Sequence, residues 1–419
     1  MGTIFSSKQQ ANLLAPCMEG NLDEVKRLVG IYIADHRSSR SRSSSCRKSS
    51  SSSDLCAYIN AIDPISGNAA IHGAAFSGHL DILSFLVDSC CCGGGSKRGE
   101  PTIDLRLKNS LGCSPLWIAA GYDRIDCLQY LIDKLHRSHH QLEMALLDGN
   151  NTGDTPFLAA ASRGNMRACQ CLLDCMEKSC CCCGGDCDQD HDHHHICWNM
   201  KRKLLRTANC AGDTALKVAV ASGQDAELLT LLLDVDDQCQ EQLDKHRDDG
   251  NEDANHVVNR MEDDTIMYSK CINRKNKMGL SPLIVACERN QPSSVELLLD
   301  HGADICIRDM TCRSPLAVAA FCGCMDVVEL LLNKIDVASS SSSTNTATIA
   351  SSSLLNDVDN NGCTPLWLAA RTGNLSMVKL LVDAGADATK KNKDDMSPLD
   401  VAVKFKKDAV VEFLSQMAQ

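Results

Sequence analysis

The sequence predicts an all-α fold, a solenoid of about eight to nine helix-turn-helix repeats, and three observations support this. A short block recurs eight times along the 419 residues. A Leu-rich segment with the spacing of an amphipathic helix follows each block. Aromatic residues make up only 4% of the chain. The core must therefore consist mainly of Leu, Val, Ile and Ala, which suits thin layers of packed helices.

The recurring block combines an opening glycine, a Ser/Thr-Pro pair, two alanines and a closing glycine. Its copies are GNAAIHGAAFSG (67–78), GCSPLWIAAGYD (112–123), GDTPFLAAASRG (153–164), GDTALKVAVASG (212–223), GLSPLIVACERN (279–290), CRSPLAVAAFCG (312–323), GCTPLWLAARTG (362–373) and DMSPLDVAVKFK (395–406). A ninth, degenerate copy at 12–34 keeps only the second-helix segment GNLDEVKRLV, and we expect it to cap the array.

Each residue type in the block has a local role. Ser or Thr before Pro supplies an N-cap and the residue best suited to the first helical position. The alanine pair keeps the first helix slim, so that neighbouring repeats can approach closely. The closing glycine ends that helix in a left-handed conformation. Asp123 and Asn290 replace it in two copies, and these residue types tolerate that conformation best after glycine.

The pattern resembles the ankyrin repeat family, whose motif reads G-x-T-P-L-H-x-A-A-x-x-G-H/N before a Leu-rich helix. The resemblance covers most of the chain, and the family's 33-residue pitch separates Pro282 from Pro315 and Pro365 from Pro398. It implies an ankyrin-like α-solenoid with finger loops on one edge and a concave face that binds other proteins. The family's His, which ties each repeat to its neighbour, survives only as His72. We therefore expect a less uniform stability than in a consensus array.

The predicted function is a non-enzymatic scaffold or adaptor for protein partners. The sequence contains no phosphate-binding glycine loop, nucleophile elbow or metalloprotease helix. Trp, Tyr and Arg are the residues that most often anchor interfaces. The candidate partner-binding residues are exposed first-helix side chains: Trp117, Tyr122, Arg163, Arg289, Trp367 and Arg371. The alternative for Trp117 and Trp367 is that they fill the space left by the missing His.

The chain divides into an N-terminal tail, a cap, a basic Ser-rich insertion and the repeat array. The ranges are 1–11, 12–34, 35–59 and 60–419. All the residues in excess of the family pitch fall between a Leu-rich segment and the next block. The insertions therefore leave from one edge, and we expect several low-complexity ones to be disordered. They are 89–104, 134–146, 175–205, 235–271 and 334–354.

One insertion favours an alternative function as a zinc or copper buffer or sensor. Thiolates and imidazoles are the ligands that these ions prefer. The candidate ligands are Cys180, Cys183, Cys187, His191, His193 and Cys197. Their spacing fits no standard zinc finger, so the alternative interpretation is a low-complexity loop without a specific metal site. Apart from this zinc site, we expect no cofactor.

The remaining features concern location. Gly2 and Ser6 fit the N-myristoylation pattern, and the basic tract 36–53 supplies the second signal that a single lipid needs for stable attachment. The alternative is an unmodified tail. We expect the protein to be cytoplasmic, at the cytoplasmic face of a membrane if the lipid is present. No signal peptide or membrane-spanning run is apparent, and the 26 cysteines are expected to be reduced. A net charge of −12 argues against binding to nucleic acid. We expect the protein to be a monomer.

Overall fold

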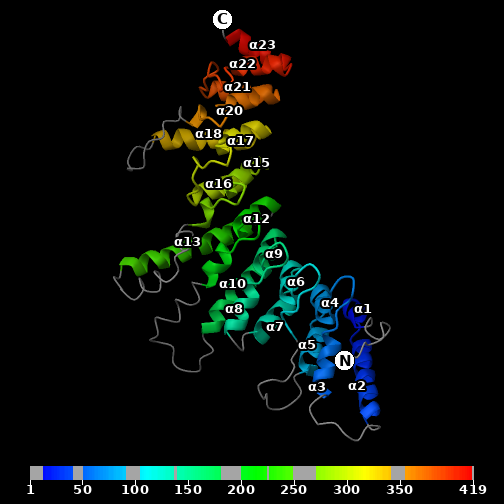
Figure 1. Ribbon diagram of the computed structural model, residues 1–419. Coiled ribbons are helices and arrows are strands. Elements are labelled where there is room, and N and C mark those ends of the chain that lie inside the picture. The colour runs from blue at the N-terminus through cyan, green and yellow to red at the C-terminus, as the bar shows by residue number, and fades with distance from the viewer. Residues whose placement is uncertain are drawn as a thin grey trace. The chain divides into compact units, whose positions relative to one another are not determined.

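The computed structural model describes residues 13–40, 51–90, 104–135, 139–180, 200–223, 226–248, 270–340 and 354–417. The chain forms two compact units, Met1–Cys210 (unit 1) and Ala211–Gln419 (unit 2) (Figure 1). Within the described ranges both units are built from helices, and the only β pairing is an isolated bridge between Ile62 and Ala69. The predicted all-α ankyrin-like solenoid is confirmed.

Unit 1 consists of helix pairs, with first helices packed on first helices and second helices on second helices. The pairs are α1 (Leu14–Glu19) with α2 (Leu22–Arg40), α4 (Ala70–Ser77) with α5 (Leu80–Cys90), α6 (Pro115–Gly121) with α7 (Ile125–Leu135), and α9 (Pro156–Ser162) with α10 (Met166–Cys180). The described part of unit 1 contains three further helices between the pairs: α3 (Ser51–Ile59), α8 (His139–Leu147) and residues 200–206.

Unit 2 repeats the same arrangement. Its pairs are α12 (Ala215–Ser222) with α13 (Ala226–Asp248), α15 (Pro282–Glu288) with α16 (Pro292–Asp300), α17 (Pro315–Cys322) with α18 (Met325–Ser340), α20 (Pro365–Thr372) with α21 (Leu375–Asp383), and α22 (Pro398–Lys404) with α23 (Asp408–Met417). A short 3-10 helix, η2 (Cys271–Asn273), packs on α15.

The Ser/Thr-Pro pairs begin the first helices as predicted. In six repeats the Ser or Thr side-chain oxygen accepts a hydrogen bond from the main-chain N–H three residues later. Each such N-cap contributes about 1 kcal/mol to stability. The bonds are Ser114 to Trp117 (3.2 Å), Thr155 to Leu158 (3.3 Å), Ser281 to Ile284 (3.3 Å), Ser314 to Ala317 (3.3 Å), Thr364 to Trp367 (3.1 Å) and Ser397 to Asp400 (3.2 Å).

The other two predicted features of the block are also confirmed. The alanine pairs of α6, α9, α17 and α20 have no exposed surface, so neighbouring first helices pack closely across them. At the helix ends, Gly78 has φ +83° and Gly373 has φ +85°. Asp123 and Asn290 take the same left-handed conformation, with φ 55° and 52°.

The insertions differ from the sequence-based expectation in their described parts. Helix α2 runs to Arg40, beyond the expected cap boundary at residue 34, and α13 runs to Asp248 inside the insertion 235–271. Helices α3 and α8 occupy the ends of two other insertions. Buried side chains such as Ile59 and Leu146 hold these helices against the stack. Composition alone could not predict these helices, because the burial of their side chains depends on the neighbouring repeats.

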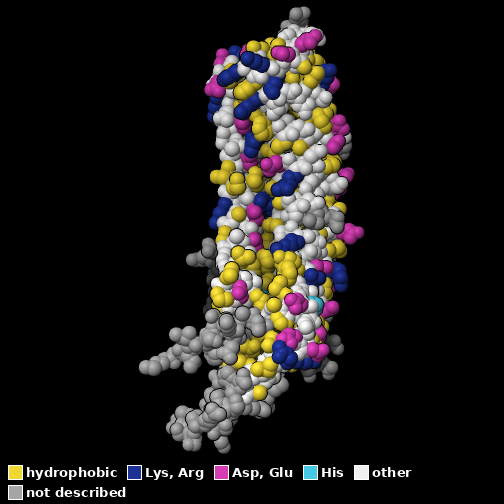
Figure 2. Space-filling model, turned by 90° about the vertical axis from the view of Figure 1, so that its right-hand side faces the viewer, with side chains coloured by type: hydrophobic (Ala, Val, Ile, Leu, Met, Phe, Trp, Pro, Cys, Tyr) yellow, Lys and Arg dark blue, Asp and Glu magenta, His cyan; other side chains and the backbone are white. Residues whose placement is uncertain are grey.

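Not all apolar side chains are buried. Figure 2 shows hydrophobic side chains between charged ones on the face that it displays. The large hydrophobic residues that are more than a third exposed include Phe76, Leu111, Tyr122, Met278, Met310, Phe321, Val403 and Phe405. Two of them, Phe76 and Tyr122, contribute to the surface described next.

Candidate partner-binding surface

The first-helix position that holds His in the ankyrin motif joins one repeat to the next. The Nδ1 atom of His72 accepts a hydrogen bond from the main-chain N–H of Ala69 at 3.0 Å. The proton must then be on Nε2, which donates to the main-chain oxygen of Leu107 at 2.9 Å. Burial lowers the pKa of His72, because it disfavours the charged ring. The neutral ring therefore ties α4 to the following finger loop.

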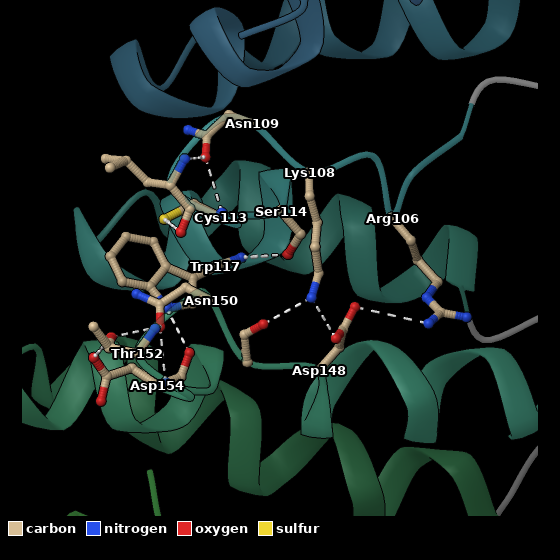
Figure 3. A network of polar contacts seen from close by, with 12 residues as sticks. Arg106, Lys108, Asn109, Cys113, Ser114, Trp117, Asp148, Asn150, Thr152 and Asp154 are labelled. Carbon is tan, nitrogen blue, oxygen red and sulfur yellow. Dashed lines mark hydrogen bonds and ion pairs between the residues drawn. The ribbon is translucent and has the colours of Figure 1, made fainter. Parts of the chain in front are cut away.

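Two tryptophans occupy the same position and make the same kind of tie. The indole Nε1 of Trp117 donates to the main-chain oxygen of Asp154 at 2.8 Å (Figure 3). That of Trp367 donates to Met396 at 3.1 Å. Trp367 is only 5% exposed, so the prediction that it lies on the open surface is wrong. The alternative, that tryptophan fills the slot left by the missing His, fits both geometries.

Three of the predicted residues come together in unit 1. The guanidinium carbon of Arg163 lies 5.1 Å from the ring centroid of Trp117 and 4.4 Å from that of Tyr122. The Tyr122 ring meets Phe76 edge to face, with ring centroids 4.5 Å apart. We call Phe76, Trp117, Tyr122 and Arg163 the aromatic–arginine cluster. It spans three consecutive repeats, and Arg163 is exposed while Trp117 is half-buried.

Gly121 makes room for this cluster. A Cβ atom on Gly121 would lie 2.4 Å from an Nη atom of Arg163, so any side chain there would displace the guanidinium. The neighbouring backbone is also fixed, because the side-chain amide of Asn165 donates to the main-chain oxygens of Ala120 and Gly121 at 3.0 and 2.8 Å. The cluster therefore sits on a rigid helix end, as a preorganised interface anchor requires.

The other predicted residues lie in unit 2. Arg289 caps the C-terminal end of α15 and is exposed. Arg371 is exposed in the last turn of α20, with its guanidinium carbon 5.5 Å from the ring centroid of Phe405. Arg371 and Arg163 thus share one arrangement, an arginine over an aromatic ring from an adjacent repeat.

The sequence analysis missed a set of polar residues at the finger loops. Three residues before the first residue of the block, an Asn or Asp side chain accepts hydrogen bonds from two main-chain N–H groups of its own loop. Asn276, for example, accepts from Met278 and Leu280 at 2.9 Å, and its amide donates to Asp213 of the preceding repeat at 2.9 Å. The equivalent residues are Asn109, Asn150, Asp309, Asp359 and Asn392.

The signal for these residues was present in the sequence. The Asn or Asp recurs three residues before the block, and therefore lies outside the twelve residues that define it. Figure 3 shows Asn109 and Asn150 in consecutive loops. In the same view Lys108 joins the loops by donating to Asp148 at 2.6 Å, and Arg106 lies 3.7 Å from that carboxylate.

Two predicted sites lie outside the described residues. Gly2 is one, and the ligand set Cys183, Cys187, His191, His193 and Cys197 is the other. Cys180 ends α10, but its side chain is likewise outside. In the described ranges, no three His, Cys, Asp or Glu side chains are grouped to hold a metal ion. No helix there has both the length and the apolarity needed to cross a bilayer.

Comparison with known proteins agrees with the geometry of the repeats. A family model of ankyrin repeats (three copies) matches residues 13–143, 264–341 and 342–419. The chain belongs to the ankyrin repeat family. It is also similar to several named proteins over part of its length.

The tyrosine-protein kinase HTK16 of Hydra vulgaris is 30% identical over 34% of this chain and 17% of its own length. NF-kappa-B inhibitor alpha of Sus scrofa is 34% identical over 28% of this chain and 33% of its own. The human transient receptor potential cation channel subfamily A member 1 is 29% identical over 27% of this chain and 10% of its own. The chain therefore spans a third or less of each of these relatives.

Proposed function

We propose that this protein is a non-enzymatic scaffold that binds partner proteins through the aromatic–arginine cluster of unit 1. The supporting observation is the state of Arg163. Its guanidinium is exposed and held over two aromatic rings, and it forms no ion pair with a carboxylate of the described residues. Arginine and tyrosine on a rigid base have the composition of an interface hot spot.

The comparisons fit this proposal in a general way. NF-kappa-B inhibitor alpha is, by its name, an inhibitor of NF-kappa-B. The similarity to HTK16 covers only 17% of that kinase and therefore does not support kinase activity in this chain. The match to the ankyrin repeat family supports interaction through the repeats.

The test compares two arginine variants of the intact chain. Arg163→Glu reverses the charge that lies over Trp117 and Tyr122. The control, Arg167→Glu, makes the same charge change outside the cluster, at an exposed position on the second helix α10. Partners captured by the wild-type chain are purified, and their affinity for each variant is measured. We expect Arg163→Glu to weaken binding at least about tenfold without lowering the melting temperature. Equal affinities for the two variants would contradict the proposal.

We also propose, from the sequence, a lipid on Gly2 that attaches the scaffold to membranes. A liposome flotation assay of the chain and its Gly2→Ala variant, both made with an N-myristoyltransferase, tests this directly. Attachment that survives the substitution would refute it. The metal-buffer alternative has its own test. Zinc bound by the purified, reduced chain should be lost when residues 175–197 are deleted.

A further inference from the structure

We propose that the C-terminal end of unit 2 carries a second binding surface, which accepts an acidic partner peptide with bulky apolar side chains. We call its residues the basic–aromatic patch: Arg371, Val403, Lys404, Phe405 and Lys406. The patch belongs to α20, α22 and the turn that follows α22. It shares no residue with the aromatic–arginine cluster, so the two surfaces can be tested independently.

The apolar part of the patch is exposed, whereas other repeats bury the residue equivalent to Val403. Val403 is 56% exposed, although the equivalent residues Ala120, Ala161 and Ala370 have no exposed surface. Phe405 is 45% exposed. Together they present apolar area that a partner side chain could bury, at about 25 cal/mol for each Å² removed from water.

The charged part of the patch consists of cations without carboxylate partners. Arg371 lies against the Phe405 ring, and the Lys404 ammonium contacts the sulfur of Met396 at 3.8 Å. Lys406 is exposed in a left-handed conformation, with φ 55°. Within residues 354–417, none of these three cations forms an ion pair. Figure 2 shows basic side chains beside hydrophobic ones at this end of unit 2, at the top of the view.

The nearest acid on α22 is already engaged. The carboxylate of Asp400 accepts hydrogen bonds from the main-chain N–H and the hydroxyl of Ser397, at 2.8 and 2.7 Å. These bonds hold the pKa of Asp400 below its usual value. They close the capping box at the start of the helix, while Lys404 lies at its end. The free cations are therefore available to a carboxylate from outside.

The combination of groups selects the partner. The exposed guanidinium of Arg371 presents a planar fork that matches a carboxylate. Arg371 and Lys404 also stabilise the C-terminal ends of their helices, but that role does not account for exposed Val403 and Phe405. A nucleic acid fits less well, because the chain carries a net charge of −12. A further stacked repeat fits poorly against three cations.

Fluorescence anisotropy with the full chain tests this surface. The probe is a labelled peptide in which Glu alternates with Leu and Phe. We expect saturable binding that weakens at least about tenfold in Arg371→Glu/Lys404→Glu and in Phe405→Ala. Binding should also fall in about 1 M salt, where the Debye length is about 3 Å. Unchanged thermal unfolding of each variant shows that the fold is intact.

The chain offers a matched control. Lys379 lies over Phe413 at 5.5 Å, the same distance as Arg371 over Phe405, but on the second helices of the same two repeats. Lys379→Glu should leave binding unchanged, and Arg163→Glu in unit 1 should do so as well. The proposal is overturned if wild type does not bind the peptide, or if Lys379→Glu weakens binding equally. Tighter binding of an all-Glu peptide, a single-stranded oligonucleotide or a phosphatidylserine vesicle would also overturn it. So would a dimer of the wild-type chain that Phe405→Ala dissociates, because the patch would then bind a second copy of this chain.

Discussion

The indole nitrogen of Trp367 donates a hydrogen bond to the main-chain oxygen of Met396, 3.1 Å away in the next repeat. The bond places tryptophan in the structural role that His72 has in α4, where the imidazole bonds to Leu107. Trp117 and Trp367 thus make the inter-repeat tie that His72 makes in α4. Where the slot holds Asp400 in the last described pair, the side chain instead closes its own helix cap.

This relationship predicts the effect of removing the ring. Trp367→Ala should lower the free energy of unfolding by about 3–5 kcal/mol, because it leaves a cavity in a buried site. Trp367→His should lower the free energy of unfolding by less, since imidazole can donate to the Met396 oxygen. Urea unfolding followed by circular dichroism measures both. A loss under about 1 kcal/mol for Trp367→Ala would show that the side chain is not part of the core.

His72 predicts a pH dependence of stability. Its pKa is lowered by burial, so the unfolded chain binds this proton more readily than the folded one. The free energy of unfolding should therefore fall as the pH drops from about 6.5 towards the lower folded pKa. His72→Gln cannot titrate, so the stability of wild type relative to the variant should decline from pH 8 to pH 5.5. Parallel pH profiles for the two proteins would rule out this contribution.

Asn276 predicts that the amide, and not only its oxygen, stabilises the stack. Asn276→Asp keeps the acceptor for Met278 and Leu280, but it sets a carboxylate against Asp213, which already binds Lys217 at 2.6 Å. We expect a loss of about 1–3 kcal/mol at pH 7. The Asp213→Asn/Asn276→Asp double variant should recover much of that loss, because it removes the repulsion. No recovery in this double-mutant cycle would contradict the proposed contact.

The cysteines predict a pattern of thiol reactivity. Burial raises the thiol pKa of Cys17 and Cys169 to about 12 and that of Cys127 to about 11. Cys210 is exposed at a finger loop. At pH 8, iodoacetamide labelling mapped by mass spectrometry should modify Cys210 while the three buried thiols react only after unfolding. Rapid labelling of Cys169 in the folded chain would show that α10 opens locally.

The features that could be predicted from the sequence are the local ones. A Ser or Thr before Pro fixes an N-cap without help from the rest of the chain, and a glycine such as Gly373 fixes a left-handed end. The burial of Trp367 could not be predicted, because it depends on where the carbonyl of Met396 falls in the next repeat. The helix α8 was hidden for a similar reason, since Leu146 becomes buried only against neighbouring helices.

The candidate site was predictable as a set of residues but not as an arrangement. The choice of Tyr122 and Arg163 rested on residue type and first-helix position. Their contact across repeats requires the stacking register and the missing side chain at Gly121. Phe76 was overlooked because one aromatic residue in one repeat gives no periodic signal.

Site-specific photo-crosslinking tests the central claim most directly. A photoreactive phenylalanine replaces Tyr122 in the aromatic–arginine cluster, and in a parallel sample it replaces Arg167 on α10. The account predicts that irradiation of the intact chain with its captured partner yields a covalent adduct from position 122 and none from position 167. Equal adducts from both positions, or an adduct from position 167 alone, would contradict it.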